Sequence, residues 1–125
     1  MLIERTASNV YRFAVEPVNL PAWAAGLGGS IRQAAGRWIA DSPMGEAVVA
    51  FAERNDLGVL DHDVTLPSGA TVYNPMRVIP NGEGCEVVFT LRCRPEMSAE
   101  GFTADAHAVE VDLAKLKELL EATAP

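Results

Sequence analysis

Alternating apolar and polar positions run through the middle of the chain. The clearest alternation lies in residues 85–94, whose apolar phase consists of Cys85, Val87, Phe89, Leu91 and Cys93. Successive side chains of a strand point to opposite faces, so this segment predicts a strand with one buried and one solvated face. Similar segments, separated by short turn-forming stretches, lie at residues 30–33, 36–41, 46–54, 58–66 and 70–79. Because these connections are short, the pattern predicts an antiparallel sheet.

The last part of the chain has the spacing of an amphipathic helix. Ser98 is suited to cap the N-terminus of a helix over residues 99–122. Apolar residues recur at spacings of three and four at Phe102, Ala106, Val109, Leu113, Leu116 and Leu120. This stripe would lie on one face of a helix roughly 36 Å long, which only a sheet of similar extent can cover. A coiled coil would show the same stripe, but the strands also need a partner layer.

Side-chain size changes along this helix. Its early half carries the small residues Gly101, Ala104, Ala106 and Ala108, and its later half carries Leu113, Leu116, Leu119 and Leu120. Space left by the small residues either forms a cavity between helix and sheet or is filled by side chains of the sheet. His107 is expected at the edge of the stripe. The acidic residues are interpreted as the solvated face: Glu110, Asp112, Glu118 and Glu121.

The N-terminal region predicts a short strand and two short helices. Residues 2–6 suit a strand, and a helix is expected to follow and to end before Pro17. A second helix is expected over residues 20–27, with Asn19 as its cap and Gly28 at its end. The whole set of elements predicts an α+β fold in which a curved antiparallel sheet of about six or seven strands wraps around the long C-terminal helix.

Several stretches carry a resemblance to a known family. Residues 3–23 contain a strand end, a helix with valine and tyrosine, and an asparagine–proline turn ahead of Trp23. Together with residues 55–69, residues 77–91 and the terminal helix, they resemble the START-like, or SRPBCC, superfamily. This is the helix-grip fold of polyketide cyclase/dehydrase and lipid-transport proteins. The resemblance covers most of the chain and implies a single domain over residues 1–125.

The resemblance also implies a deep apolar cavity between the sheet and the long helix. Members of the superfamily bind lipids, sterols, polyketides, quinones or hydrophobic hormones, and some catalyse reactions on them. Their first strand is usually longer than residues 2–6 allow, so either the sheet edge is trimmed or the start codon is misplaced. A trimmed edge leaves backbone groups that can pair with a second copy, which allows a homodimer.

Composition narrows the classes of partner. The net charge of −7 and the pI of about 4.7 disfavour nucleic acid, because an acidic chain repels phosphates. No apolar run approaches the roughly 18 residues that span a bilayer, so stable membrane insertion is not expected. The cysteines, Cys85 and Cys93, are too few for a disulfide framework and are predicted to be buried thiols of a cytoplasmic protein. The chain has no P-loop or dinucleotide fingerprint, and no cofactor is predicted.

The segment GVLDHDVTL, residues 58–66, places a histidine between two aspartates. In a strand, His62 shares a face with the apolar residues of the segment, whereas Asp61 and Asp63 point the other way, toward water. Adjacent strand residues cannot all face one ion, so no metal site is predicted. His62 is expected either to line the cavity or to bond a neighbour in the core. A reference pKa near 6.5 would suit it to acid–base catalysis.

Other candidate ligand contacts follow from the same face assignments. Asn74 is a second polar group on the predicted inner face, and Tyr73 replaces it if a bulge at Pro75 shifts the phase. Trp23 and Trp38 suit either the core or contact with a ligand. The predicted ligand-contacting residues are Trp23, Trp38, His62, Asn74, Met76, Phe89 and Phe102.

These observations favour a protein that binds a small hydrophobic or aromatic molecule of lipid, polyketide or quinone type. A second hypothesis is an enzyme, a cyclase, dehydratase or isomerase of polyketide type, with His62 as its general acid or base. A third is an interaction module that uses the same fold without a ligand. The catalytic residues of an enzyme, apart from His62, are not identified by any motif in the chain.

Overall fold

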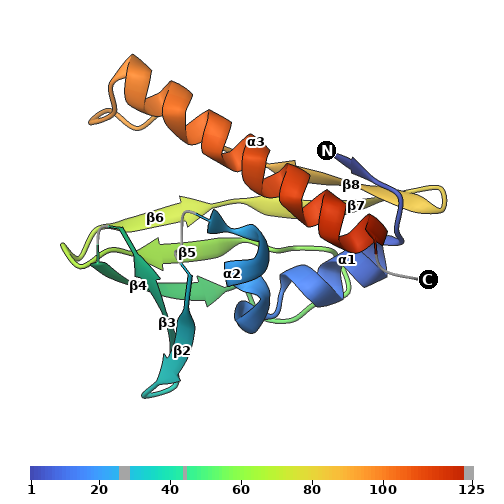
Figure 1. Ribbon diagram of the computed structural model, residues 1–125, viewed down its shortest axis with the longest axis horizontal. Coiled ribbons are helices and arrows are strands. Elements are labelled where there is room, and N and C mark those ends of the chain that lie inside the picture. Colours follow the sequence, from blue (N-terminus) through green and yellow to red (C-terminus); the bar gives the residue numbers. More distant parts are fainter. Residues whose placement is uncertain (26–28, 44, 123–125) are drawn as a thin grey trace.

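The computed structural model describes residues 1–25, 29–43 and 45–122 and has an α+β fold (Figure 1). In this described part, one antiparallel sheet has the order β2-β3-β4-β5-β6, formed by Ile31–Ala34, Arg37–Ser42, Gly45–Phe51, His62–Thr65 and Thr71–Asn74. A second sheet has the order β1-β8-β7, formed by Leu2–Ile3, Gly84–Phe89 and Met76–Asn81. The predicted antiparallel pairing is confirmed, but the strands belong to two sheets and not to one of six or seven strands.

Pro75 marks the boundary between the sheets. It divides the predicted strand 70–79, because β6 ends before this proline and β7 begins after it. Proline has no N–H to donate to a ladder, which explains a break at this position. Backbone bonds nevertheless join the two sheets here, since Leu60 N donates to Met76 O at 2.9 Å.

Gly58 secures the same junction. Val78 N donates to Gly58 O at 2.8 Å, and Gly58 has a φ of 74°. A Cβ at this position would lie 2.2 Å from Val78 O, so any other residue would force the two backbones apart. The predicted strand 58–66 therefore contacts β7 through its first residues and β6 through its last.

The N-terminal helices are short. Helix α1 (Ala7–Ala14) begins after Thr6, whose side chain accepts a hydrogen bond from Asn9 N at 3.2 Å, as a capping residue should. A 3-10 turn, η1 (Pro17–Asn19), leads directly into α2 (Leu20–Trp23). The two helices predicted before the sheet are thus confirmed.

The second helix is shorter than the predicted range 20–27, since α2 ends at Trp23. The glycine expected to stop it, Gly28, lies outside the described residues. Asn19 precedes the helix, but its side chain donates to Phe13 O at 2.9 Å and does not cap α2. This bond ties the end of α1 to the start of α2.

Helix α3 (Ala99–Ala122) has the predicted bounds. Its buried residues all lie in its second half, at Leu113, Leu116 and Leu120. They join a core that includes Ile3, Val10, Leu20, Met76, Val78 and Val87. Figure 1 shows the second half of α3 beside β7, β8 and α1, whereas its first turns rise away from β6. No helix in the described residues is long and apolar enough to cross a membrane.

The two cysteines differ in environment. Cys85 is buried in β8, as predicted. Cys93 is exposed, and the prediction for it was wrong because β8 ends at Phe89 and the alternating sequence continues as a loop.

Candidate functional site

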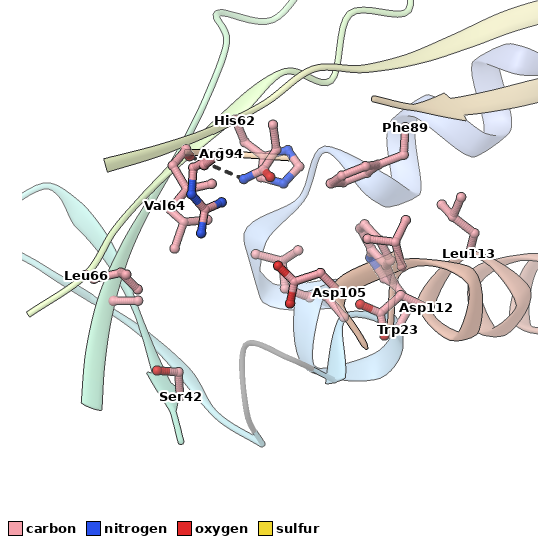
Figure 2. Close-up of a pocket in the computed structure, with 16 residues that line it drawn as sticks. Trp23, Ser42, His62, Val64, Leu66, Phe89, Arg94, Asp105, Asp112 and Leu113 are labelled. Atoms are coloured by element: carbon pink, nitrogen blue, oxygen red, sulfur yellow. Dashed lines mark hydrogen bonds between the residues drawn. The ribbon is translucent and has the colours of Figure 1, made fainter. Parts of the chain in front are cut away.

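A cavity of about 270 Å³ lies between helices α2 and α3 and the inner face of the five-stranded sheet (Figure 2). Its wall is mainly apolar and includes Leu20, Ala47, Val64, Leu66, Val72 and Leu113. The polar residues on the wall are Ser42, His62, Asn74, Arg94, Asp105 and Asp112. An apolar cavity with a few polar groups is the usual form of a small-molecule site.

His62 is the buried polar residue of the sheet wall, with 7% of its surface exposed. Its Nδ1 lies 3.0 Å from Leu60 O, and a carbonyl can only accept, so Nδ1 carries the hydrogen. Nε2 is therefore an acceptor, and none of the described residues bonds to it. The ring lies between Phe51 and Phe89, with centroids 5.0 and 6.0 Å away.

The environment of His62 favours its neutral form. Burial lowers the pKa of the imidazole, and the bond to Leu60 and the charges of Asp61 and Asp63 oppose this only in part. A neutral imidazole with a free Nε2 can accept a hydrogen bond or a proton from a molecule in the cavity.

Trp23, in α2, contributes an aromatic wall, and its indole N–H is unusual. Its side chain is 5% exposed, and its Nε1 is buried without a hydrogen-bond partner in the described structure. A buried N–H that lost its bond to water destabilises a protein by about 1–3 kcal/mol. This N–H is closed off from the cavity as well as from solvent, so Trp23 contributes its aromatic surface to the wall.

Helix α3 places two carboxylates on the opposite wall. Asp105 and Asp112 are seven residues apart, which brings both to the same helix face as Val109. Figure 2 shows them across the cavity from His62 and Val64. Asp112 accepts a hydrogen bond from Ala25 N at 3.2 Å. Burial raises the pKa of Asp112, and this bond opposes the shift in part.

These two aspartates were missed from the sequence. Asp112 was interpreted as part of the solvated face of the helix, and this was wrong because it is only partly exposed and lines the cavity. Their spacing in the sequence could have indicated this position. Asp105 and Asp112 are four residues before and three residues after Val109, so they lie on the helix face of the apolar stripe. His107, by contrast, is exposed, in agreement with its expected place at the edge.

Arg94 and Ser42 were also missed. Arg94 was expected on a strand, but it lies in the loop that leads from β8 to α3 and reaches the wall from there. Its Nε donates to Glu96 Oε1 at 2.7 Å, so its charge is largely countered. Ser42 is the last residue of β3, and no motif distinguishes it.

The structure brings four of the seven predicted ligand-contacting residues to the cavity: Trp23, His62, Asn74 and Phe89. Met76 is 1% exposed and lies in the core, because the break at Pro75 moves it into the other sheet. Trp38 lines a separate surface depression, and Phe102 lies near the start of α3, beyond the cavity wall. Met76, Trp38 and Phe102 thus do not line this cavity. Whether any of the seven contacts a ligand stays a prediction.

Asp61 was expected to face water, and this was also wrong. Its side chain is 13% exposed and accepts hydrogen bonds from Tyr73 Oη at 2.5 Å, from Met76 N at 2.9 Å and from the Arg77 guanidinium. Burial tends to raise the pKa of Asp61, but these bonds and the charge of Arg77 outweigh it and lower the pKa. Asp63 is exposed, as predicted. Asp61 thus serves the junction at Pro75 and not the cavity.

Metal-binding groups do not gather in the structure. Among the described residues, no three histidine, cysteine, aspartate or glutamate side chains are placed to hold one ion. No protein-family model matches the chain, and no curated protein is significantly similar to it. Function must therefore be argued from the cavity itself.

Proposed function

We propose that this protein binds a small, largely apolar or aromatic molecule in the cavity between the sheet and α3. The observation that carries this proposal is the cavity of about 270 Å³, with its mainly apolar wall and its few polar groups. An aromatic body of roughly 150 Å² would contribute about 4 kcal/mol by burial at 25 cal/mol per Å². A hydrogen bond to His62 would then orient the molecule.

We further propose that the chain has the helix-grip arrangement of the START-like superfamily. If β6 and β7 are taken as one strand bent at Pro75, the order becomes β1-β8-β7/β6-β5-β4-β3-β2, which is a single curved sheet. The backbone bond between Leu60 and Met76 across the junction supports this interpretation. Carriage or sequestration of a ligand by such a domain needs no catalytic residue.

Binding can be tested with tryptophan fluorescence. Trp23 lines the cavity and Trp38 does not, so Trp38→Phe leaves an emission spectrum that reports on the cavity alone. Addition of 1-octanol to this variant should shift the emission of Trp23 in a saturable manner. Native mass spectrometry of the protein from its own host should show a bound hydrophobic molecule.

A blocking variant completes the test. Val64 lies on the cavity wall and is only partly buried, so Val64→Phe should fill the space with little change in folding. In the Trp38→Phe background it should abolish the saturable shift. An equal response with and without Val64→Phe would show that octanol does not bind in the cavity, and the proposal would fail.

The unbonded Nε2 of His62 favours one second candidate, an enzyme in which this atom takes a proton from a substrate. His62→Ala should then abolish turnover of an identified substrate while binding of 1-octanol persists. Unchanged turnover would exclude His62 as the general base.

A further inference from the structure

The polar atoms of the cavity wall differ in charge and in hydrogen-bonding role, and they select among apolar ligands. We infer that the ligand carries a cationic donor group, of the ammonium type, at its polar end. This inference rests on the proposed function, and it names the chemical class of the molecule.

Charge on the wall is the first argument. Asp105 and Asp112 form no ion pair with any described residue, and both are partly buried. The cationic residue on the wall, Arg94, is paired with Glu96. The charge left without a protein partner is therefore negative. A cation in the cavity would gain attraction that is stronger beside apolar surfaces than in water.

Hydrogen-bonding role is the second argument. Nε2 of His62 is an acceptor on a residue that is 7% exposed, and the second oxygen of Asp112 accepts no bond from the described residues. An ammonium group has three N–H donors and no acceptor, so it matches this wall. A carboxylate on a ligand would meet the acceptor Nε2 of His62 and the carboxylates of Asp105 and Asp112. On the described wall, Arg94 alone offers it a positive charge, and the Nε of that residue is bonded to Glu96.

The α2 side of the wall contributes the aromatic surface of Trp23. The Nε1 donor of Trp23 is buried and unpartnered, on a side chain that is 5% exposed. Because this N–H is closed off from the cavity as well as from solvent, it does not select among ligands. The faces of Trp23 and Phe89 also attract a cation placed near them. The geometry thus points to an apolar or aromatic amine, not to a fatty acid or another organic anion.

Three probes with the same aromatic body separate charge from size: 2-naphthylmethylamine, 2-naphthalenemethanol and 2-naphthoic acid. At neutral pH they are cationic, neutral and anionic. In isothermal titration calorimetry at low salt, the amine should bind about five- to tenfold more tightly than the alcohol, and the acid should bind most weakly. Higher salt should reduce the difference in affinity between the amine and the alcohol, because the carboxylates of Asp105 and Asp112 are partly exposed and salt screens their charge.

Matched variants locate the effect. Asp112→Asn and Asp105→Asn each keep an acceptor oxygen and remove one charge, so they should lower the preference for the amine about threefold and leave the alcohol unchanged. Glu110→Gln is the control, because it removes the same charge from an exposed position on α3. If Glu110→Gln lowers the preference for the amine over the alcohol by the same factor, that preference depends on the net charge of the protein and not on the cavity wall, and the inference is overturned.

The outcomes separate the two proposals. If the acid binds as tightly as the amine or more so, the cationic ligand is excluded while the binding function stands. If none of the three probes binds while 1-octanol still gives its saturable shift, the cationic ligand is excluded and the binding function stands. If 1-octanol also gives no saturable shift, both proposals fail.

Discussion

The two halves of helix α3 have similar apolar spacing in the sequence and opposite environments in the structure. In the second half, Leu113, Leu116 and Leu120 are buried. In the first half, no residue is buried, although Phe102 and Ala106 continue the stripe. Figure 1 shows the reason: the second half lies along β7, β8 and α1, whereas the first half diverges from the sheet. An apolar stripe therefore predicts a helix, but not how much of it is covered.

The two parts of the helix are therefore expected to have different roles, one in the stability of the fold and the other in ligand binding. Large leucines in the second half fill the space between helix, β1 and α1, so that half holds the fold together. Near the middle of the helix, where it departs from the sheet, Asp105 and Val109 face the cavity. Substitutions in the two halves should thus have different consequences.

The largest expected effect concerns Leu116, which is fully buried. Leu116→Ala should lower the free energy of unfolding by about 3 kcal/mol, because it removes buried methyl groups and leaves a cavity. Phe102→Ala, in the first half, should cost about 1 kcal/mol or less, since Phe102 is already partly exposed. Urea denaturation of both variants measures the contrast. Equal losses would mean that the first half of α3 is as firmly packed as the second.

A smaller effect is expected at the junction between the two sheets. Asp61→Asn replaces the carboxylate that accepts from Tyr73, Met76 and Arg77, and should lower the free energy of unfolding by about 1–2 kcal/mol. The control is Asp63→Asn. Asp63 follows His62 in the chain as Asp61 precedes it, but Asp63 is exposed, so this substitution should leave the free energy of unfolding unchanged. A similar stability for both variants would show that Asp61 does not hold the junction.

The junction also shows where sequence analysis reaches its limit. Alternation located the strand segments and the apolar stripe located α3, because each depends on local periodicity. The division at Pro75 depends on which backbone pairs with residues before and after it, a long-range property that no local pattern records. Met76 was therefore assigned to the wrong environment although its phase was read correctly.

The cavity wall was predicted in part for a related reason. His62, Asn74 and Phe89 were found because they stand in the inward phase of strands. Asp112 was missed because charge was taken as a sign of solvent exposure, and Asp105 was not singled out by any pattern. On a helix that leaves its sheet, a carboxylate beside the stripe faces the space that opens there.

The smallest expected effect near neutral pH is the ionisation of His62. Burial lowers its pKa below the ordinary value of 6.5, so at acidic pH the unfolded chain binds a proton before the folded chain does. The free energy of unfolding should be insensitive to this group above pH 6.5 and should fall as the pH drops from there through the folded-state pKa. Urea denaturation of the wild-type protein and of His62→Gln across this pH range measures this effect. The difference between the two proteins separates the contribution of His62 to the unfolding free energy from that of the carboxylates.

Proton NMR measures the pKa of His62 in the folded protein directly, and it does not depend on the stability of His62→Gln. The chain has two histidines, so His107→Gln leaves His62 as the source of the imidazole signals. Because His107 is exposed, this substitution should leave the fold intact. The His62 signal should titrate below 6.5, and naphthylmethylamine in the cavity should lower the midpoint further, since a cation beside the ring opposes its protonation. A midpoint at or above 6.5 would mean that water reaches the ring freely, and the contrast between a buried sheet wall and an open helix end would not hold.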